Sequence, residues 1–116
     1  MTEFILPWPP SILSPNNRQH WGSKVKVRAK CRADGALLTQ LAMMKSQERL
    51  PIGNIPMKLI FHPPTKRQPD LDNLLASMKN YLDGVADALG VNDKCFQPIT
   101  CEYGEPRKRG EVVVRI

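Results

Sequence analysis

The clearest pattern in this chain is an apolar stripe that repeats every three or four positions between residues 71 and 89. Its members are Leu71, Leu75, Met78, Leu82, Val85 and Leu89. Steps of three and four residues place side chains on one face of an α-helix, so the spacing predicts one long amphipathic helix that ends at Gly90. We expect this face to be buried against a sheet, a second subunit, or both.

A second helix is predicted from about Ala29 to Gln47, where apolar residues again recur at helical spacing and no proline occurs. These residues are Ala33, Leu37, Leu41 and Met44. Gly35 lies inside the segment and costs roughly 1 kcal/mol relative to alanine in a helix.

Residues 24–32 overlap the start of that helix but show another period, because every second side chain is basic. The five basic residues are Lys24, Lys26, Arg28, Lys30 and Arg32. Period two predicts a short strand with all five charges on one face. Like charges arranged in this way repel one another unless an anion joins them, which favours contact with a nucleic-acid backbone.

Further segments predict strands, separated by turns and by a proline-rich loop over residues 7–22. The strands are Phe4–Leu6, Met57–His62, and a closing hairpin of Gln97–Tyr103 and Glu111–Ile116 around residues 104–110. The order of elements predicts an α+β fold in a single small domain over residues 1–116. We expect a mixed β-sheet with two main helices packed on it.

The balance of charges indicates what kind of partner to expect. Seventeen Lys and Arg against eleven Asp and Glu give a net charge of +6, which is typical of proteins that bind polyanions such as nucleic acid. Three cysteines without C-x-x-C spacing argue against a disulfide framework and a zinc site, and favour a reducing compartment. No signal region and no apolar run of ~20 residues is evident, so we expect a cytoplasmic protein with no membrane partner.

Two carboxylates one residue apart, in Asp70-Leu71-Asp72-Asn73, are the strongest candidates for chemistry. Carboxylate oxygens are hard ligands suited to Mg²⁺, with Mn²⁺ as a substitute, and such ions bridge protein carboxylates to phosphate oxygens. The alternative is that one aspartate only caps the helix that follows. A second carboxylate close by adds repulsion unless a cation neutralises it, which favours the metal site. Nothing in the sequence indicates an organic cofactor.

Asp93 and Lys79 are two further candidates for this site. Asp93 follows the predicted helix, which is ~30 Å long, so it reaches Asp72 only if the chain folds back or the helix is shorter. Lys79 leaves the helix on the same face as Asp72, where its ammonium could stabilise a phosphate in a transition state. The alternatives are an ordinary polar turn at Asp93 and an exposed ion pair between Lys79 and Asp83.

Other polar residues, in the proline-rich loop and beside Asp70 and Asp72, are candidates for contact with nucleic acid, in addition to the five basic residues at 24–32. They are Arg18, His20, Lys66, Arg67 and Asn73. His62 stands at a strand end before two prolines and is interpreted as structural.

Four motifs in order resemble the RusA family of Holliday-junction resolvases. They are Leu6-Pro7-Trp8-Pro9-Pro10-Ser11, Asn16-Asn17-Arg18, Asp70-Leu71-Asp72-Asn73-Leu74 and Asn92-Asp93. The similarity spans nearly the whole chain. It implies a bacterial or phage Mg²⁺-dependent endodeoxyribonuclease, active as a homodimer, that cuts four-way DNA junctions by paired symmetric nicks in recombination and repair.

The resemblance assigns the acidic metal site to Asp70, Asp72 and Asp93. Members of the family usually place the catalytic lysine four residues after the second acid, where this chain has Ala76. Lys79 is the nearest lysine, about 4.5 Å further along the helix axis, and is the candidate for that role. Residues 12–15 resemble an insertion in the proline-rich loop.

Two other classes of function compete with a nuclease. A non-catalytic module that binds junctions or RNA would use the aspartates only as helix caps, and its binding would be sensitive to salt. A small metal-binding protein without nucleic acid would leave the basic stripe unexplained.

Overall fold

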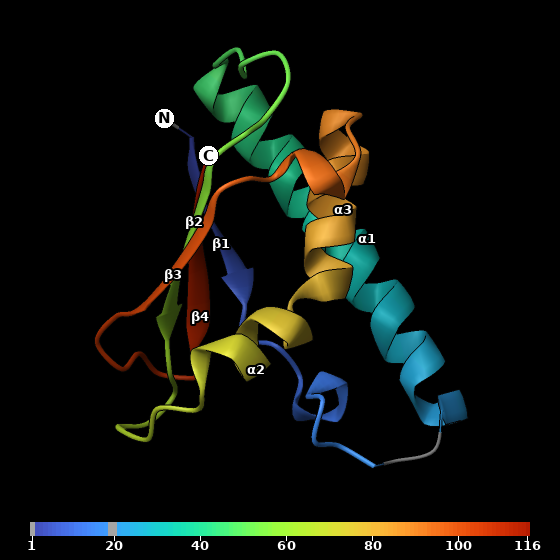
Figure 1. Cartoon of the computed structure of the whole chain (residues 1–116), viewed down its shortest axis with the longest axis vertical. Coiled ribbons are helices and arrows are strands. Elements are labelled where there is room, and N and C mark those ends of the chain that lie inside the picture. The colour runs from blue at the N-terminus through green and yellow to red at the C-terminus, as the bar shows by residue number, and fades with distance from the viewer. Residues whose placement is uncertain (1, 19–20) are drawn as a thin grey trace.

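Helices cover one face of a four-stranded sheet in the computed structural model, which describes residues 2–18 and 21–116 (Figure 1). His20, one of the residues expected to contact nucleic acid, lies outside the described residues. The predicted α+β class with a mixed sheet is confirmed. Among the described helices, none combines the length and the apolar character that a membrane span needs.

The sheet contains β1 (Glu3–Pro7), β2 (Met57–His62), β3 (Ile99–Tyr103) and β4 (Glu111–Arg115), in the order β1-β4-β2-β3. Strand β4 is antiparallel to β1 and β2, whereas β2 and β3 are parallel. The predicted closing hairpin is therefore wrong, because β2 lies between β3 and β4. The two central strands carry the side chains that are most fully buried, so the fold places them inside and leaves the less apolar β3 at an edge.

The loop between β3 and β4 crosses the end of β2 and is tied to it. The backbone N–H of Arg107 donates to the carbonyl of Pro63 at 2.9 Å. His62 is buried beneath this loop, with Nδ1 2.8 Å from the carbonyl oxygen of Glu105, in agreement with its interpretation as structural.

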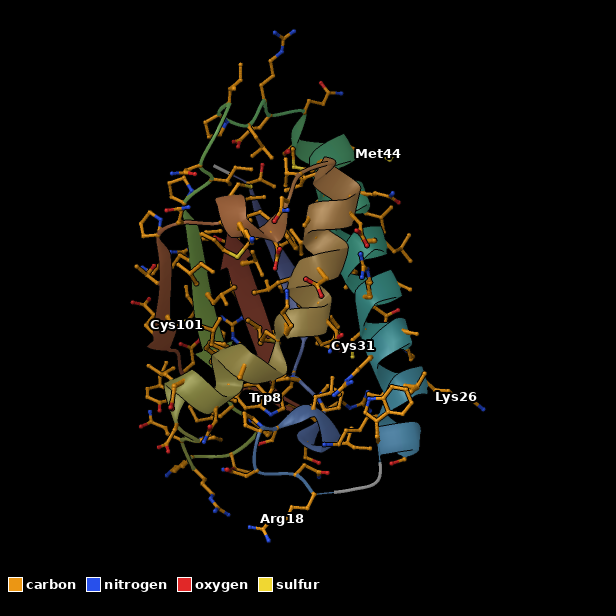
Figure 2. The ribbon with its side chains drawn as sticks, turned by 45° about the vertical axis from the view of Figure 1, so that its right-hand side comes forward. Trp8, Arg18, Lys26, Cys31, Met44 and Cys101 are labelled. Atoms are coloured by element: carbon orange, nitrogen blue, oxygen red, sulfur yellow. The ribbon has the colours of Figure 1, made fainter. Side chains whose placement is uncertain are left out.

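Helix α1 (Trp21–Ser46) runs for 26 residues and starts before the predicted boundary. The strand expected at residues 24–32 is wrong, because a second pattern runs beneath the charges. Val27, Cys31, Gly35 and Leu38 recur at helical spacing and face the core. On a helix the five basic residues diverge to two sides, and Figure 2 shows Lys26 pointing away from the molecule.

The apolar residues used to predict this helix lie on its outer side. Leu37 and Leu41 are each 54% exposed and Met44 is 73% exposed. The inward face uses small residues instead, because α1 packs very closely on α3 (Lys79–Leu89). A Cβ added at Gly35 would lie 2.3 Å from the carbonyl oxygen of Tyr81, so only glycine allows the two helices to come this close. Glycine is a poor helix former, but its small size is needed here.

The long helix predicted over residues 71–89 is divided into α2 (Leu71–Ser77) and α3 by Met78. Ser77 Oγ donates to the carbonyl of Asn73 at 2.8 Å, and the N–H of Met78 bonds to the carbonyl of Leu75 in a tighter turn. Both features bend a helix. The apolar stripe nevertheless faces the core as predicted, and Gly90 ends α3 in the left-handed conformation.

The described residues also form two short 3-10 helices, η1 (Ser11–Leu13) in the proline-rich loop and η2 (Asp93–Cys95) after α3.

Candidate active site

A hollow of about 720 Å³ lies between the proline-rich loop, the segment before α2, α2 itself and the β3–β4 loop. Its lining residues are Trp8, Pro9, Pro10, Ser11, Ser14, Asn16, Arg67, Gln68, Pro69, Asp70, Asn73, Leu74, Ser77 and Arg109. Three of the four motifs singled out in the sequence therefore contribute to one concave surface. Figure 2 shows Trp8 beside α2, at the end of the sheet.

Packing fixes the walls of this hollow. The Trp8 ring meets Phe61 edge-on, with centroids 6.1 Å apart and an interplanar angle of 89°. Gly110 backs against Trp8, since a Cβ at this position would lie 3.0 Å from Trp8 Cβ. The Tyr103 hydroxyl donates to the carbonyl of Pro69, another lining residue, at 2.6 Å. This bond holds the chain immediately before Asp70.

Asp70 immediately precedes α2, but its side chain makes no capping hydrogen bond. The backbone carbonyl of Asp70 accepts from the N–H of Leu74 at 3.0 Å, and the carboxylate itself lines the hollow. Asp72 lies exposed in the first turn of α2 and is not part of the hollow's lining. Among the described residues neither carboxylate has an ion-pair partner. The capping alternative therefore does not account for the Asp70 side chain.

Lys79, the first residue of α3, joins two carboxylates. Its Nζ lies 2.7 Å from Oδ1 of Asp83 and 2.5 Å from Oδ2 of Asp93. The chain reaches Asp93 by folding back after α3, through a hydrogen bond from the N–H of Val91 to the carbonyl of Ala86. These carboxylates raise the pKa of Lys79, and the hydrogen bond from Lys79 lowers the pKa of Asp93.

The expected set of three carboxylates is thus divided between two places. Asp70 and Asp72 stand at the start of α2, while Asp93 is held by Lys79. In the part of the chain that the structure describes, no group of three or more His, Cys, Asp or Glu is gathered in a way that would hold a metal ion. The sequence analysis treated Asp83 only as an ion-pair partner of Lys79. Its position one turn after Lys79 is the sequence signal for its place in the cluster of Lys79, Asp83 and Asp93.

The predicted nucleic-acid contacts are also distributed over separate elements. Arg67 and Asn73 line the hollow with Asp70, and Lys66 is exposed beside it. On α1, Lys30 pairs with Asp34 at 2.6 Å and Arg32 binds Asp87 through two bonds of 2.6 and 2.9 Å.

The other predicted contacts lie at the N-terminal end of α1 and before it. Lys24 donates to the carbonyl of Asn17 at 3.0 Å. Within the described residues Lys26 and Arg28 make no ion pair. Figure 2 shows the Arg18 side chain extending away from the fold.

Comparison with known proteins finds a close relative of unassigned function. No family model matches the chain. A protein of Xylella fastidiosa (strain Temecula1 / ATCC 700964), described as an uncharacterized protein, is 38% identical over 117 residues, an alignment that covers 100% of this chain and 76% of the relative.

Proposed function

The chain belongs to the same family as this Xylella fastidiosa protein, and we propose that its members are RusA-type endonucleases that resolve four-way DNA junctions with Mg²⁺. The observation that carries the proposal is the hollow in which Asp70 and Asn73 meet the proline-rich motif. A concave site with a carboxylate and basic side chains suits a phosphodiester and a cation together.

The chemistry of the available donors supports a metal at the start of α2. Asp70 and Asp72 offer oxygen ligands that no capping bond or ion pair occupies among the described residues. Asp93 becomes a ligand only by exchanging Lys79 for the metal, because the ammonium now neutralises it. A bound Mg²⁺ would activate water and stabilise the leaving oxygen of the phosphodiester.

Lys79 is the proposed catalytic lysine. Two carboxylates keep its ammonium charged and limit its directions at the junction of α2 and α3. With Asp93 on a metal, the pair with Asp83 would still orient the ammonium, and an oriented cation stabilises negative charge that develops on a phosphate. The resemblance assigns this role, and the ion pairs supply a means of orienting the side chain.

The candidate basic residues that do not line the hollow are proposed to hold the DNA arms. They are Arg18, Lys24, Lys26, Arg28, Lys30, Arg32 and Lys66, with His20 added from the sequence alone. The five basic residues at 24–32 lie on two sides of α1, and Arg18 and Lys66 lie outside that helix. Together they would contribute a broad positive field rather than one charged strand face.

The proposal includes a homodimer, since a junction with two-fold symmetry needs two equivalent sites. The outer face of α1 supports a second copy as the occupant, because Leu37, Leu41 and Met44 are exposed there. In an isologous interface the same surface patch of each copy meets its counterpart. An uncharged apolar stripe can pack against a second copy of itself, whereas the basic surfaces of a protein with a net charge of +6 would repel one another.

The test is a pair of substitutions, Asp70→Asn and Asp72→Asn, assayed on a labelled four-way junction. We expect cleavage to be lost while junction binding persists and the thermal stability stays close to that of the wild type, because neither side chain caps α2. Full cleavage by either variant would refute the assigned site. Loss of stability with unchanged binding would instead support a non-catalytic module.

A further inference from the structure

Arg109 is the one residue of the β3–β4 loop that lines the hollow, and neither sequence pattern nor resemblance points to it. Its neighbour Arg107 is engaged within the loop, 3.1 Å from Oε1 of Glu105 and 3.3 Å from Oε1 of Glu111. Among the described residues, Arg109 has no such partner, and neither does the Arg67 guanidinium on the wall before α2. Arg107 therefore holds the loop together through its ion pairs, whereas Arg109 lines the hollow.

The charge balance of the hollow favours an anion. Its charged lining residues are Arg67, Asp70 and Arg109, two cations against one carboxylate. A metal ion on Asp70 would make the hollow still more positive. A phosphodiester carries the single negative charge that compensates, and a guanidinium presents its N–H groups in a fork that matches two phosphate oxygens.

The backbone at Arg109 is an independent observation. Its φ is +68°, in the left-handed region that costs energy for a residue with a side chain, and Gly110 follows at +69°. At Gly110 a Cβ would also lie only 3.0 Å from Trp8 and from Pro64. Arg109 carries a side chain on a backbone conformation that glycine adopts at lower cost, and residues held in this way cluster at active sites and ligand clamps.

We propose that Arg109, with Arg67, binds a phosphodiester of the nucleic-acid strand that enters the hollow beside Asp70. This inference rests on the proposed function and adds a positioning contact to it. The loop that crosses β2 delivers the guanidinium, and the packing of Gly110 on Trp8 sets where it lies. Arg109 thus holds the strand in register with the carboxylate.

The experiment measures binding without cleavage, by fluorescence anisotropy of a labelled four-way junction in EDTA over a series of salt concentrations. We expect Arg109→Gly to weaken binding about five- to tenfold and to reduce the slope of log K against log[salt] by about 1, the loss of one phosphate contact. Its melting temperature should equal or exceed that of the wild type, because glycine adopts the left-handed conformation freely.

Lys108→Gly is the matched control, since it removes one positive charge from the same loop at an exposed residue outside the hollow. We expect less than a twofold change in its affinity. Arg109→Asn, which also tolerates a left-handed backbone, should reproduce the loss, and Arg109→Lys should restore part of it. Wild-type affinity and slope in both Arg109→Gly and Arg109→Asn would overturn the inference.

The nuclease activity and the phosphate contact of Arg109 can be refuted independently. If the wild type never cuts a junction but the slope falls by about 1 in Arg109→Gly, the phosphate contact stands and the nuclease does not. If the wild type cuts and Arg109→Gly binds and cuts as well as Lys108→Gly, the nuclease stands and the contact does not.

Discussion

The Nζ atom of Lys79 lies 2.5 Å from Oδ2 of Asp93, fourteen residues further along the chain, and 2.7 Å from Oδ1 of Asp83. The ammonium therefore pairs with both carboxylates and links the start of α3 to η2. If Asp93 joined the metal proposed at the start of α2, Asp83 would remain the partner of Lys79.

The first prediction concerns this lysine. Lys79→Gln should lower the rate of junction cleavage at saturating Mg²⁺ by about a hundredfold, the usual cost of removing one donor that stabilises developing negative charge. Single-turnover cleavage of a labelled junction measures the effect. Lys94→Gln is the control, because Lys94 is exposed next to Asp93 but makes no ion pair among the described residues. Activity of Lys79→Gln within threefold of the control would remove Lys79 from the catalytic site.

The second prediction tests the contact of α1 with α3. A Cβ at Gly84 would lie 2.0 Å from the carbonyl oxygen of Arg32, so Gly84→Ala must separate the helices. We expect a loss of about 1–3 kcal/mol in the free energy of unfolding, despite the better helix propensity of alanine. Urea denaturation followed by circular dichroism measures it.

The control for the helix contact is Ala33→Gly, on the exposed side of α1. It should cost only about 1 kcal/mol through helix propensity. A Gly84→Ala variant more stable than the wild type would contradict the packing described.

The third prediction concerns the dependence of stability on pH. The hydrogen bond from Arg32 lowers the pKa of Asp87 below its ordinary value of 3.8. A carboxylate with a depressed folded-state pKa stabilises the fold fully above the unfolded value, and this contribution is lost as the pH falls through the folded value. The stability of the wild type should therefore exceed that of Asp87→Asn by a small constant amount near pH 7.

This difference between wild type and Asp87→Asn should begin to decrease as the pH falls below the unfolded-state value of 3.8, and it should vanish once the pH lies below the lower folded-state pKa. Melting temperatures from pH 3 to 7 provide the comparison. Arg32→Gln should give the same curve, because it removes the same bond. Variants that remain equal to the wild type at neutral pH would show that the pair contributes nothing measurable.

The fourth prediction concerns the exposed stripe on α1. Leu37→Glu with Leu41→Glu should convert the proposed homodimer into a monomer of 13.1 kDa, as measured by light scattering after size exclusion. Four like charges facing one another across a two-fold axis would repel strongly in a desolvated interface. Ile52→Glu is the control, since this residue is fully exposed in a loop outside α1 and should leave the assembly unchanged. A double variant that remains dimeric would place the interface elsewhere.

The sequence predicted the elements that local periodicity determines. The stripe from Leu71 to Leu89 faces the core because its spacing matches one helix face, whatever the surrounding fold. The same reasoning failed on α1, where the apolar spacing of Leu37, Leu41 and Met44 describes the exposed side. The buried side is made of Cys31, Gly35 and Thr39, since close helix packing selects small residues that carry little hydrophobic signal.

Relationships across the chain were not predictable in this way. The order β1-β4-β2-β3 depends on which strand the sheet buries at its centre, so adjacency in sequence suggested a hairpin that does not exist. In the candidate site, the motifs singled out candidate residues but not which of them lie together. Lys79 contacts Asp93 because the helix breaks at Met78 and the chain folds back after α3. Arg109 lines the hollow only because tertiary packing brings the β3–β4 loop to it.

Junction resolution is tested by incubating the wild-type protein with a labelled synthetic four-way junction and a matched linear duplex, with Mg²⁺ or EDTA, and separating the products on a denaturing gel. We expect paired symmetric nicks in the junction alone and only with Mg²⁺. A junction that is retarded on a native gel, yet remains uncut with Mg²⁺ or Mn²⁺, would contradict this expectation.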